Sequence, residues 1–271
     1  MRLRPPDFLR WPQPHSCGSR NVWPPCETVT GMSALIGSAD CPPARLAATR
    51  AGLHQVAEHV LAAARYAATG KIGLEPSPGG FRTPPLRADG SFLAVDGTEL
   101  VAGGGEGARR VVLTTIRAAA EFAGITPGAP AQVYKPATPL NLDEPLMIDP
   151  DAACLLAEWY QLGAQAMSRF ASEIPGDEPG AVVLWPEHFD VGMTAAAVNY
   201  GASPGDEHIT EPYLYVGPHA GPPPGDPAFW NAPFGAARTF NQIGTVAEAA
   251  AFFNDGRARA LAATIPTRRT S

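Results

Sequence analysis

Hydrophobic side chains recur along this chain at helical spacing in four segments, which proline- or glycine-rich breaks separate. The apolar positions fall three and four residues apart, as they do on one face of an amphipathic helix. The clearest segment begins at Asp149, a helix N-cap, and continues with Pro150 at the first helical position. Another ends where Gly70 follows Thr69. The pattern therefore predicts helices over residues 43–68, 115–123, 150–172 and 246–262.

Shorter segments follow a period of two or are rich in β-branched residues, and these predict strands. The pair Asp96-Gly97 separates two such segments and is a strong hairpin signal. A proline-rich connection over 126–145 divides the chain into two halves, each of which runs helix, short strands, helix. We therefore expect an α+β fold in which short antiparallel strands pack against about four helices, with the two halves as candidates for an internal repeat. The predicted strands cover residues 71–74, 91–95, 99–102, 110–113, 181–185, 188–198 and 211–217.

The domain organisation follows from where this periodicity begins and ends. Residues 1–42 are rich in proline and carry no sustained apolar period, which is typical of a disordered N-terminal tail. Met32 lies shortly before the first helix, so our hypothesis is that translation starts there and that residues 1–31 are a gene-model extension. Residues 43–262 then form a single α+β domain, and residues 263–271 form a polar C-terminal tail.

Composition and charge narrow the class of protein. The 28 glycines and 30 prolines favour turns and short elements over a bundle of long helices. The net charge of −6, with only short runs of arginine, argues against nucleic acid as a partner. No apolar stretch reaches the roughly 18 residues of a membrane span, and no apolar core follows the basic start as in a signal peptide. We expect a soluble, cytoplasmic protein whose oligomeric state the sequence leaves open.

The segment from His54 to His59 looks like a zinc-protease helix at first sight. Helices of that kind place two histidines four residues apart on one face. Here the separation is five, which turns the second histidine about 140° away on a regular helix. His54 and Glu58 do share a face at a spacing of four, which is more often a surface pair than a functional site.

A better candidate for chemistry is His188-Phe189-Asp190. As a strand, this segment places Phe189, Val191 and Met193 toward the core, and His188 and Asp190 together on the opposite face. Residues two apart on a strand lie about 7 Å apart, so the carboxylate can orient the imidazole or both can bind one metal. The alternative is a half-buried strand whose polar residues only face solvent.

The loop that follows adds more groups of the same kind. It carries Asp206, His208 and Glu211, and it can close over the sheet face that bears His188 and Asp190. Clusters of histidine, aspartate and glutamate suit zinc, manganese or iron. These five residues are therefore the candidate ligands of a divalent metal, and a merely solvated acidic loop is the alternative.

Several short segments resemble an uncharacterised bacterial family, one of the domain-of-unknown-function families. The likeness spans about residues 53–217, and it departs from the family at 79–81, where this chain lacks the tryptophan-rich pattern of the first turn. No activity is established for that family, so the resemblance implies only that residues 44–262 are one domain. The matching segments are 70–74 ahead of 77–78, the helix start at 151–153, Trp185 with 189–191, and 201–205 leading to 211–213.

Our first hypothesis is that the protein has a small-molecule site. In its most specific version, this site binds a metal and catalyses a hydrolysis. His188 is then a metal ligand or general base, and Asp190 is its orienting carboxylate or co-ligand. Convergence of both residues with the loop 206–211 in a concave pocket would favour this hypothesis.

The second hypothesis is a non-catalytic binding or protein-interaction domain. In that case His188 and Asp190 only face outward. Exposed aromatic side chains at Tyr213, Tyr215 and the pair 229–230 would favour it, because interfaces are rich in tyrosine and tryptophan.

Overall fold

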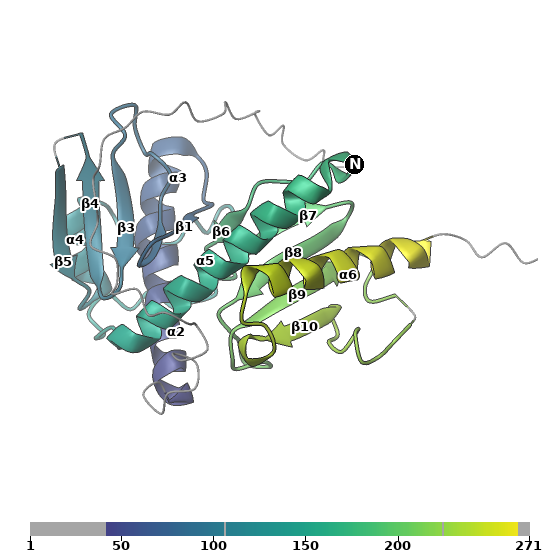
Figure 1. The fold of residues 1–271 in the computed structure, drawn as a ribbon. Helices are drawn as coiled ribbons and strands as arrows, with labels where there is room; N and C mark the ends of the chain where they lie inside the picture. The colour runs from purple at the N-terminus through teal and green to yellow at the C-terminus, as the bar shows by residue number, and fades with distance from the viewer. Residues whose placement is uncertain (1–41, 106, 224, 265–271) are drawn as a thin grey trace, which may run out of the picture.

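The computed structural model describes residues 42–105, 107–223 and 225–264, and its α+β class is the one predicted. Within these residues the chain forms two five-stranded antiparallel sheets with helices before and after each (Figure 1). Both sheets are meanders, in which each strand pairs with its neighbours in sequence. The expected N-terminal tail and the hypothesis on Met32 fall outside the described residues, apart from Pro42.

The first half begins with one long helix. α2 (Pro43–Val56) continues through the π-helical turn η1 (Ala57–Ala62) into α3 (Ala63–Thr69), which ends at Gly70 with φ of 70°. Glycine adopts this left-handed conformation without steric cost, so the helix ends where predicted. The sheet and the closing helix are β1 (Glu75–Ser77), β2 (Gly80–Arg82), β3 (Phe92–Asp96), β4 (Glu99–Gly104), β5 (Gly107–Val112) and α4 (Ile116–Ala123).

The second half repeats this order. α5 (Pro150–Glu173) begins at Asp149, whose side chain accepts the backbone N–H groups of Asp151 and Ala152, as expected of an N-cap. Each half therefore runs helix, five-stranded meander, helix. The remaining elements are η2 (Pro175–Asp177), β6 (Val183–Trp185), β7 (Asp190–Ala195), β8 (Val198–Ser203), β9 (Tyr213–Pro218), β10 (Ala236–Thr239), η3 (Phe240–Gln242) and α6 (Val246–Thr264).

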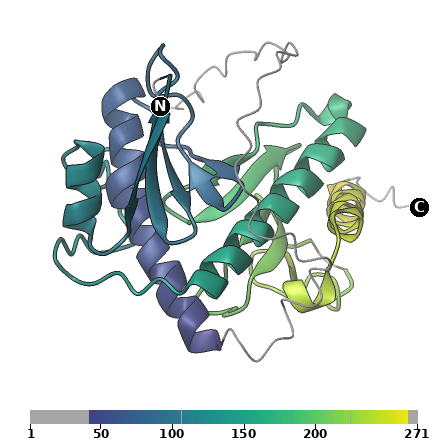
Figure 2. The same ribbon diagram turned by 60° about the vertical axis from the view of Figure 1, so that its left-hand side comes forward.

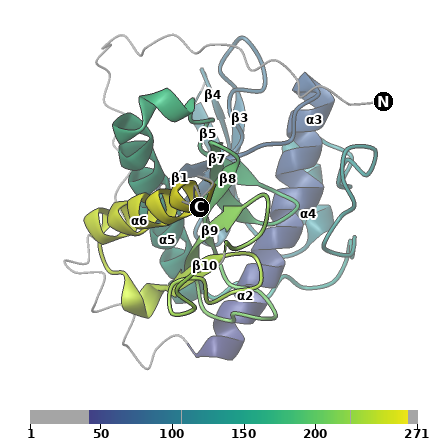
Figure 3. The ribbon, with the colours of Figure 1, turned by 90° about the vertical axis from the view of Figure 1, so that its right-hand side faces the viewer.

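α5 and α6 lie side by side on one face of the second sheet (Figures 1 and 3). Two glycines permit this close approach. A Cβ on Gly163 of α5 would overlap Ala202, and one on Gly256 of α6 would lie 2.7 Å from Val216. The described residues include no helix that is long and apolar enough to cross a membrane.

A backbone bridge joins the edges of the two sheets. Leu74, just before β1, and Leu184 of β6 exchange two backbone hydrogen bonds, with N···O distances of 2.8 and 2.9 Å. Each leucine precedes a proline by two positions, Pro76 and Pro186, so the pair occupies matching places in the two halves. α2 also packs against α5 (Figure 2). A single hydrophobic core cluster consequently runs through both halves.

The predicted strand over 188–198 was wrong, because it is a hairpin. β7 and β8 are joined by a two-residue turn at Ala196-Ala197, with φ of 48° and 60°. Such a turn needs positive φ at both positions and is normally signalled by asparagine or glycine, so alanine gives no warning of it.

The first sheet also begins later than predicted, because the strand expected over 71–74 does not form. Only Leu74 of that segment pairs, and β1 lies beyond it, over Glu75–Ser77. The turn itself is Pro78-Gly79, and β2 follows it. β2 and β10 were not predicted, because neither short segment shows an apolar alternation.

Candidate functional site

A pocket of about 560 Å³ opens on the second sheet, on the face that points away from α5 and α6. This volume lies in the range of small-molecule sites. Successive side chains of a strand point to opposite faces, so alternate residues of β8 and β9 reach the pocket while their neighbours pack under the helices. The polar and aromatic side chains that line it are His188, Asp190, Asn199, Ser203, Asp206, Tyr213, Tyr215, His219 and Phe234.

Asp190, the first residue of β7, contributes a buried carboxylate to the pocket. The residue is 8% exposed, and its Oδ2 accepts a 2.5 Å hydrogen bond from the Tyr215 hydroxyl. Its Oδ1 is buried and has no hydrogen-bond partner among the described residues. Burial raises the pKa of the Asp190 carboxyl, and the Tyr215 hydroxyl and the nearby His188 offset this only in part. An unpaired buried oxygen costs about 1–3 kcal/mol until a donor reaches it.

Two glycines make the contact between Asp190 and Tyr215 possible. Gly192, Gly201 and Tyr215 lie in cross-strand register on β7, β8 and β9. A Cβ on Gly201 would overlap the tyrosine ring, and one on Gly192 would lie 3.2 Å from its hydroxyl oxygen. The ring therefore extends across both glycines and brings its hydroxyl to Asp190. Burial raises the pKa of the Tyr215 hydroxyl, so this group keeps its proton and donates.

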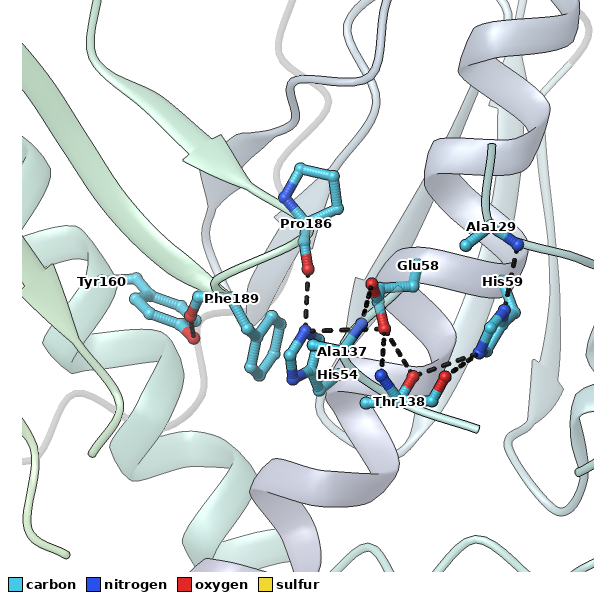
Figure 4. Close-up of polar contacts among 9 residues, drawn as sticks. All are labelled: His54, Glu58, His59, Ala129, Ala137, Thr138, Tyr160, Pro186 and Phe189. Atoms are coloured by element: carbon cyan, nitrogen blue, oxygen red, sulfur yellow. Dashed lines mark hydrogen bonds and ion pairs between the residues drawn. The ribbon is translucent and has the colours of Figure 1, made fainter. Parts of the chain in front are cut away.

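The turn between β6 and β7 places His188 at the rim of the pocket. Within it Phe189 has φ of 54°, a left-handed conformation that is rare for a bulky residue. The Phe189 ring stacks on His54 of α2 with centroids 5.1 Å apart, and its carbonyl oxygen accepts a 2.6 Å hydrogen bond from Tyr160 of α5. His54 Nε2 lies 2.8 Å from the Pro186 carbonyl oxygen (Figure 4). Contacts from two helices therefore fix the strained turn that carries His188.

The loop between β8 and β9 borders the pocket on another side. Arg50 of α2 donates to the carbonyl oxygens of Pro204 and Thr210, at 3.4 and 3.3 Å. Asp206 in this loop accepts two backbone N–H groups at 2.7 and 2.8 Å, and the Tyr213 hydroxyl at 2.6 Å. Burial acts to raise the pKa of Asp206, but these hydrogen bonds outweigh it and the pKa is lowered. The Asp206 carboxylate is therefore ionised at neutral pH.

Only part of the predicted metal set lies together. The His208 side chain is 83% exposed, and Glu211 bonds to a side chain of η3, so neither lines the pocket. In the described part of the chain, no group of three or more histidine, cysteine, aspartate or glutamate side chains is arranged to hold a metal ion. The predicted residues that do share the pocket are His188, Asp190 and Asp206.

His188 and Asp190 line the same pocket, although His188 lies in the turn before β7 and not in the strand predicted for it. Phe189, Val191 and Met193 are buried, which agrees with the other half of that prediction. Among the hydrogen bonds of the described residues, however, Asp190 is paired with Tyr215 and not with His188. The catalytic roles of His188 and Asp190 therefore stay predictions.

His54 is half-buried and its partner Glu58 is buried, so the expected surface pair was wrong. Glu58 is fully buried, and His59 is 2% exposed. The Glu58 carboxylate accepts the backbone N–H groups of Ala137 and Thr138 at 3.0 and 2.8 Å, and the Thr138 hydroxyl at 2.6 Å (Figure 4). It also lies 3.8 Å from His54 Nε2. The prediction failed because the connection between the halves folds back over this helix and covers it.

His59 anchors the same connection. Its Nδ1 accepts the Ala129 N–H at 3.0 Å, so Nε2 carries the proton and donates to the Thr138 carbonyl oxygen at 3.2 Å. The π-helical turn η1 interrupts the regular ladder here, and the His59 carbonyl oxygen accepts the Gly128 N–H at 3.0 Å. We call Glu58, His59 and Thr138 the linker anchor, and it is a structural feature outside the pocket.

In comparisons with protein families, curated proteins and solved structures, nothing matches this chain. The resemblance to an uncharacterised bacterial family therefore stays a prediction. The function has to be argued from the chemistry of the pocket.

Proposed function

We propose that this protein binds a small molecule in the pocket of the second sheet. The observation that carries the proposal is the Asp190 carboxylate, which lines the pocket while its buried Oδ1 has no partner among the described residues. Buried polar atoms in native proteins are paired in the great majority of cases, and exceptions call for an explanation. A ligand that supplies a hydrogen-bond donor provides one.

The construction of the pocket supports the same proposal. Contacts from α2 and α5 fix the turn that bears His188, and Arg50 fixes the loop that bears Asp206. A preformed site loses little conformational entropy when a ligand binds. A hydrolytic step with His188 as general base, and a divalent metal at the site, remain predictions that binding itself does not require.

The alternative of an interaction domain has less support from the described residues. Tyr213 and Phe229 are buried at 6% and 4% exposure, and Tyr215 and Trp230 are half-buried. These four aromatic side chains therefore do not form the exposed surface that a partner protein would cover.

The proposal is tested by screening a diverse library of soluble fragments against ¹⁵N-labelled protein. We expect hits that shift the backbone amide signals of Gly205, Gly217 and Gly221, all of which line the pocket. In Gly201→Ala the new methyl group displaces the Tyr215 ring, so we expect the dissociation constants of these hits to rise about tenfold or more.

Gly176→Ala is the matched control. A Cβ at Gly176 has no atom within 4 Å and needs no positive φ, so this variant should bind the same fragments as the wild type. Circular dichroism establishes that both variants are folded. If no fragment shifts the pocket amides, or if the hits bind Gly201→Ala as well as the wild type, the proposed site is wrong.

A further inference from the structure

We infer that the ligand is a small organic amine bound in its ammonium form, an inference that rests on the proposed function of the pocket. Two aspartates line the pocket, whereas no lysine or arginine is among the described residues that line it. Three features of the pocket favour an ammonium group: the negative charge of the two aspartates, the unpaired Oδ1 of Asp190, and the aromatic rings beside them.

The charge of the pocket favours a cation. Asp206 is held ionised by two backbone N–H groups and the Tyr213 hydroxyl. Arg50, which interacts electrostatically with Asp206 but does not line the pocket, donates to the carbonyl oxygens of Pro204 and Thr210 in the same loop. An anionic ligand would therefore meet two carboxylates and no lysine or arginine among the described lining residues, whereas an ammonium group would meet its counter-charge.

Asp190 adds a specific requirement for a donor. A carboxylate oxygen only accepts hydrogen bonds, and Tyr215 already occupies Oδ2. Oδ1 itself is buried, so a ligand N–H pairs with it after a small rotation of the carboxylate toward the pocket, and a positive charge on that nitrogen also offsets the cost of the buried negative charge. A neutral hydroxyl supplies the hydrogen bond without the charge, which is why an amine fits this site better than an alcohol.

Aromatic rings complete the site. Phe234 stacks against Tyr213 with ring centroids 6.1 Å apart, and it meets Tyr215 edge-on at 6.3 Å. All three residues line the pocket, and Phe234 is still 39% exposed, so part of its ring is open to a ligand. Ring faces attract cations through their quadrupole, and carboxylates beside aromatic rings are a recurring way to bind ammonium groups.

A series of three compounds with one shared skeleton tests the charge of the ligand. The probes are 2-phenylethylamine, 2-phenylethanol and 3-phenylpropionate, which present an ammonium, a hydroxyl and a carboxylate on the same phenylethyl group. Dissociation constants are measured by titration of the pocket amide signals. We expect the amine to bind at least about tenfold more tightly than either analogue, and Asp190→Asn to abolish this preference.

Phe234→Leu provides a second readout if Asp190→Asn does not fold. The position is partly exposed, and the loss of a ring face should weaken the amine about threefold and leave the alcohol unchanged. The inference is overturned if the alcohol or the carboxylate binds as tightly as the amine, and the proposed function then still stands. It is also overturned if no compound of the series shifts the pocket amides, in which case the fragment screen decides separately whether the pocket binds any small molecule.

Discussion

At the scale of single residues, one carboxylate connects stability with recognition. Asp190 holds its place through one hydrogen bond from Tyr215, and its second oxygen is buried without a partner among the described residues. Such a group costs folding free energy when it is ionised, because few contacts compensate its lost hydration. A cationic ligand would supply the missing contact, so the feature that weakens the ligand-free protein is the one that would recognise the ligand.

The buried Asp190 carboxyl should make the stability of the folded protein depend on pH. Burial raises the pKa of Asp190 above its ordinary value of 3.8, so the unfolded chain releases this proton at lower pH than the folded protein does. The contribution of this carboxyl to stability is then fully present below the unfolded pKa and is lost as the pH rises through the folded pKa. Asp190→Asn removes that loss, so the free energy of unfolding of the wild type should fall relative to the variant as the pH rises.

The measurement is urea unfolding of both proteins between about pH 4 and pH 8. Five other titratable groups face this carboxyl from the surrounding elements or sense its charge: Glu187, His188, Tyr160, Tyr213 and Tyr215. All five are present in both proteins, so their own titration largely cancels in the difference. Parallel stability curves for wild type and variant would contradict the prediction.

At the scale of elements, the linker anchor holds the connection between the halves against the long first helix. The Glu58 carboxylate and the His59 ring pair with backbone and side-chain groups of this connection, and both side chains are buried. A charge fully removed from water is tolerated only when it is paired and hydrogen-bonded, as Glu58 is. The anchor therefore fixes where the second half begins relative to α2, whose Arg50 and His54 hold the loop and the turn that border the pocket.

We predict that Thr138→Val lowers the free energy of unfolding by about 1.5–3 kcal/mol, because the buried Glu58 carboxylate loses its hydroxyl donor. Ser168→Ala is the control, since the Ser168 hydroxyl is exposed and bonds to the Ala164 carbonyl oxygen of its own helix at 2.8 Å. That change should stay within about 0.5 kcal/mol of the wild type. Equal effects of the two substitutions in denaturant unfolding would show that the linker anchor contributes no special stability.

At the scale of the whole molecule, we predict that the two similar halves unfold as one unit. They share a single core cluster, they meet at the Leu74–Leu184 pair, and α2 packs against α5. The pocket depends on this union, because its sheet belongs to the second half while Arg50 and His54 come from the first. Separated halves would leave both the core and the pocket incomplete.

Leu184→Ala tests this cooperativity. Leu184 is fully buried at the junction, so its truncation should cost about 2–5 kcal/mol. Hydrogen exchange should show lower protection in both sheets, for example at Leu100 of β4 and Leu214 of β9. Leu140→Ala is the control, because Leu140 is 45% exposed and its truncation should leave protection nearly unchanged. Loss of protection confined to the second sheet would mean that the halves unfold independently.

The sequence by itself determined the features that local physics controls. The caps at Asp149 and Gly70, and the hairpin at Asp96-Gly97, lie where the residue types require them. The strand period likewise placed Asp190 on the pocket face and its neighbours in the core. These features depend on backbone geometry and on side chains a few residues apart, so the chain alone specifies them.

Only the tertiary structure decided which distant residues contact Asp190 and Glu58. Tyr215 reaches Asp190 across two glycines because of the register of three strands, and Glu58 is buried because a distant connection crosses its helix. The sequence does show tyrosines two apart at Tyr213 and Tyr215, but nothing local says which glycine or which carboxylate lies opposite them. Strand register and the path of a long connection depend on the free energy of the whole core, and a single sequence shows no local sign of either.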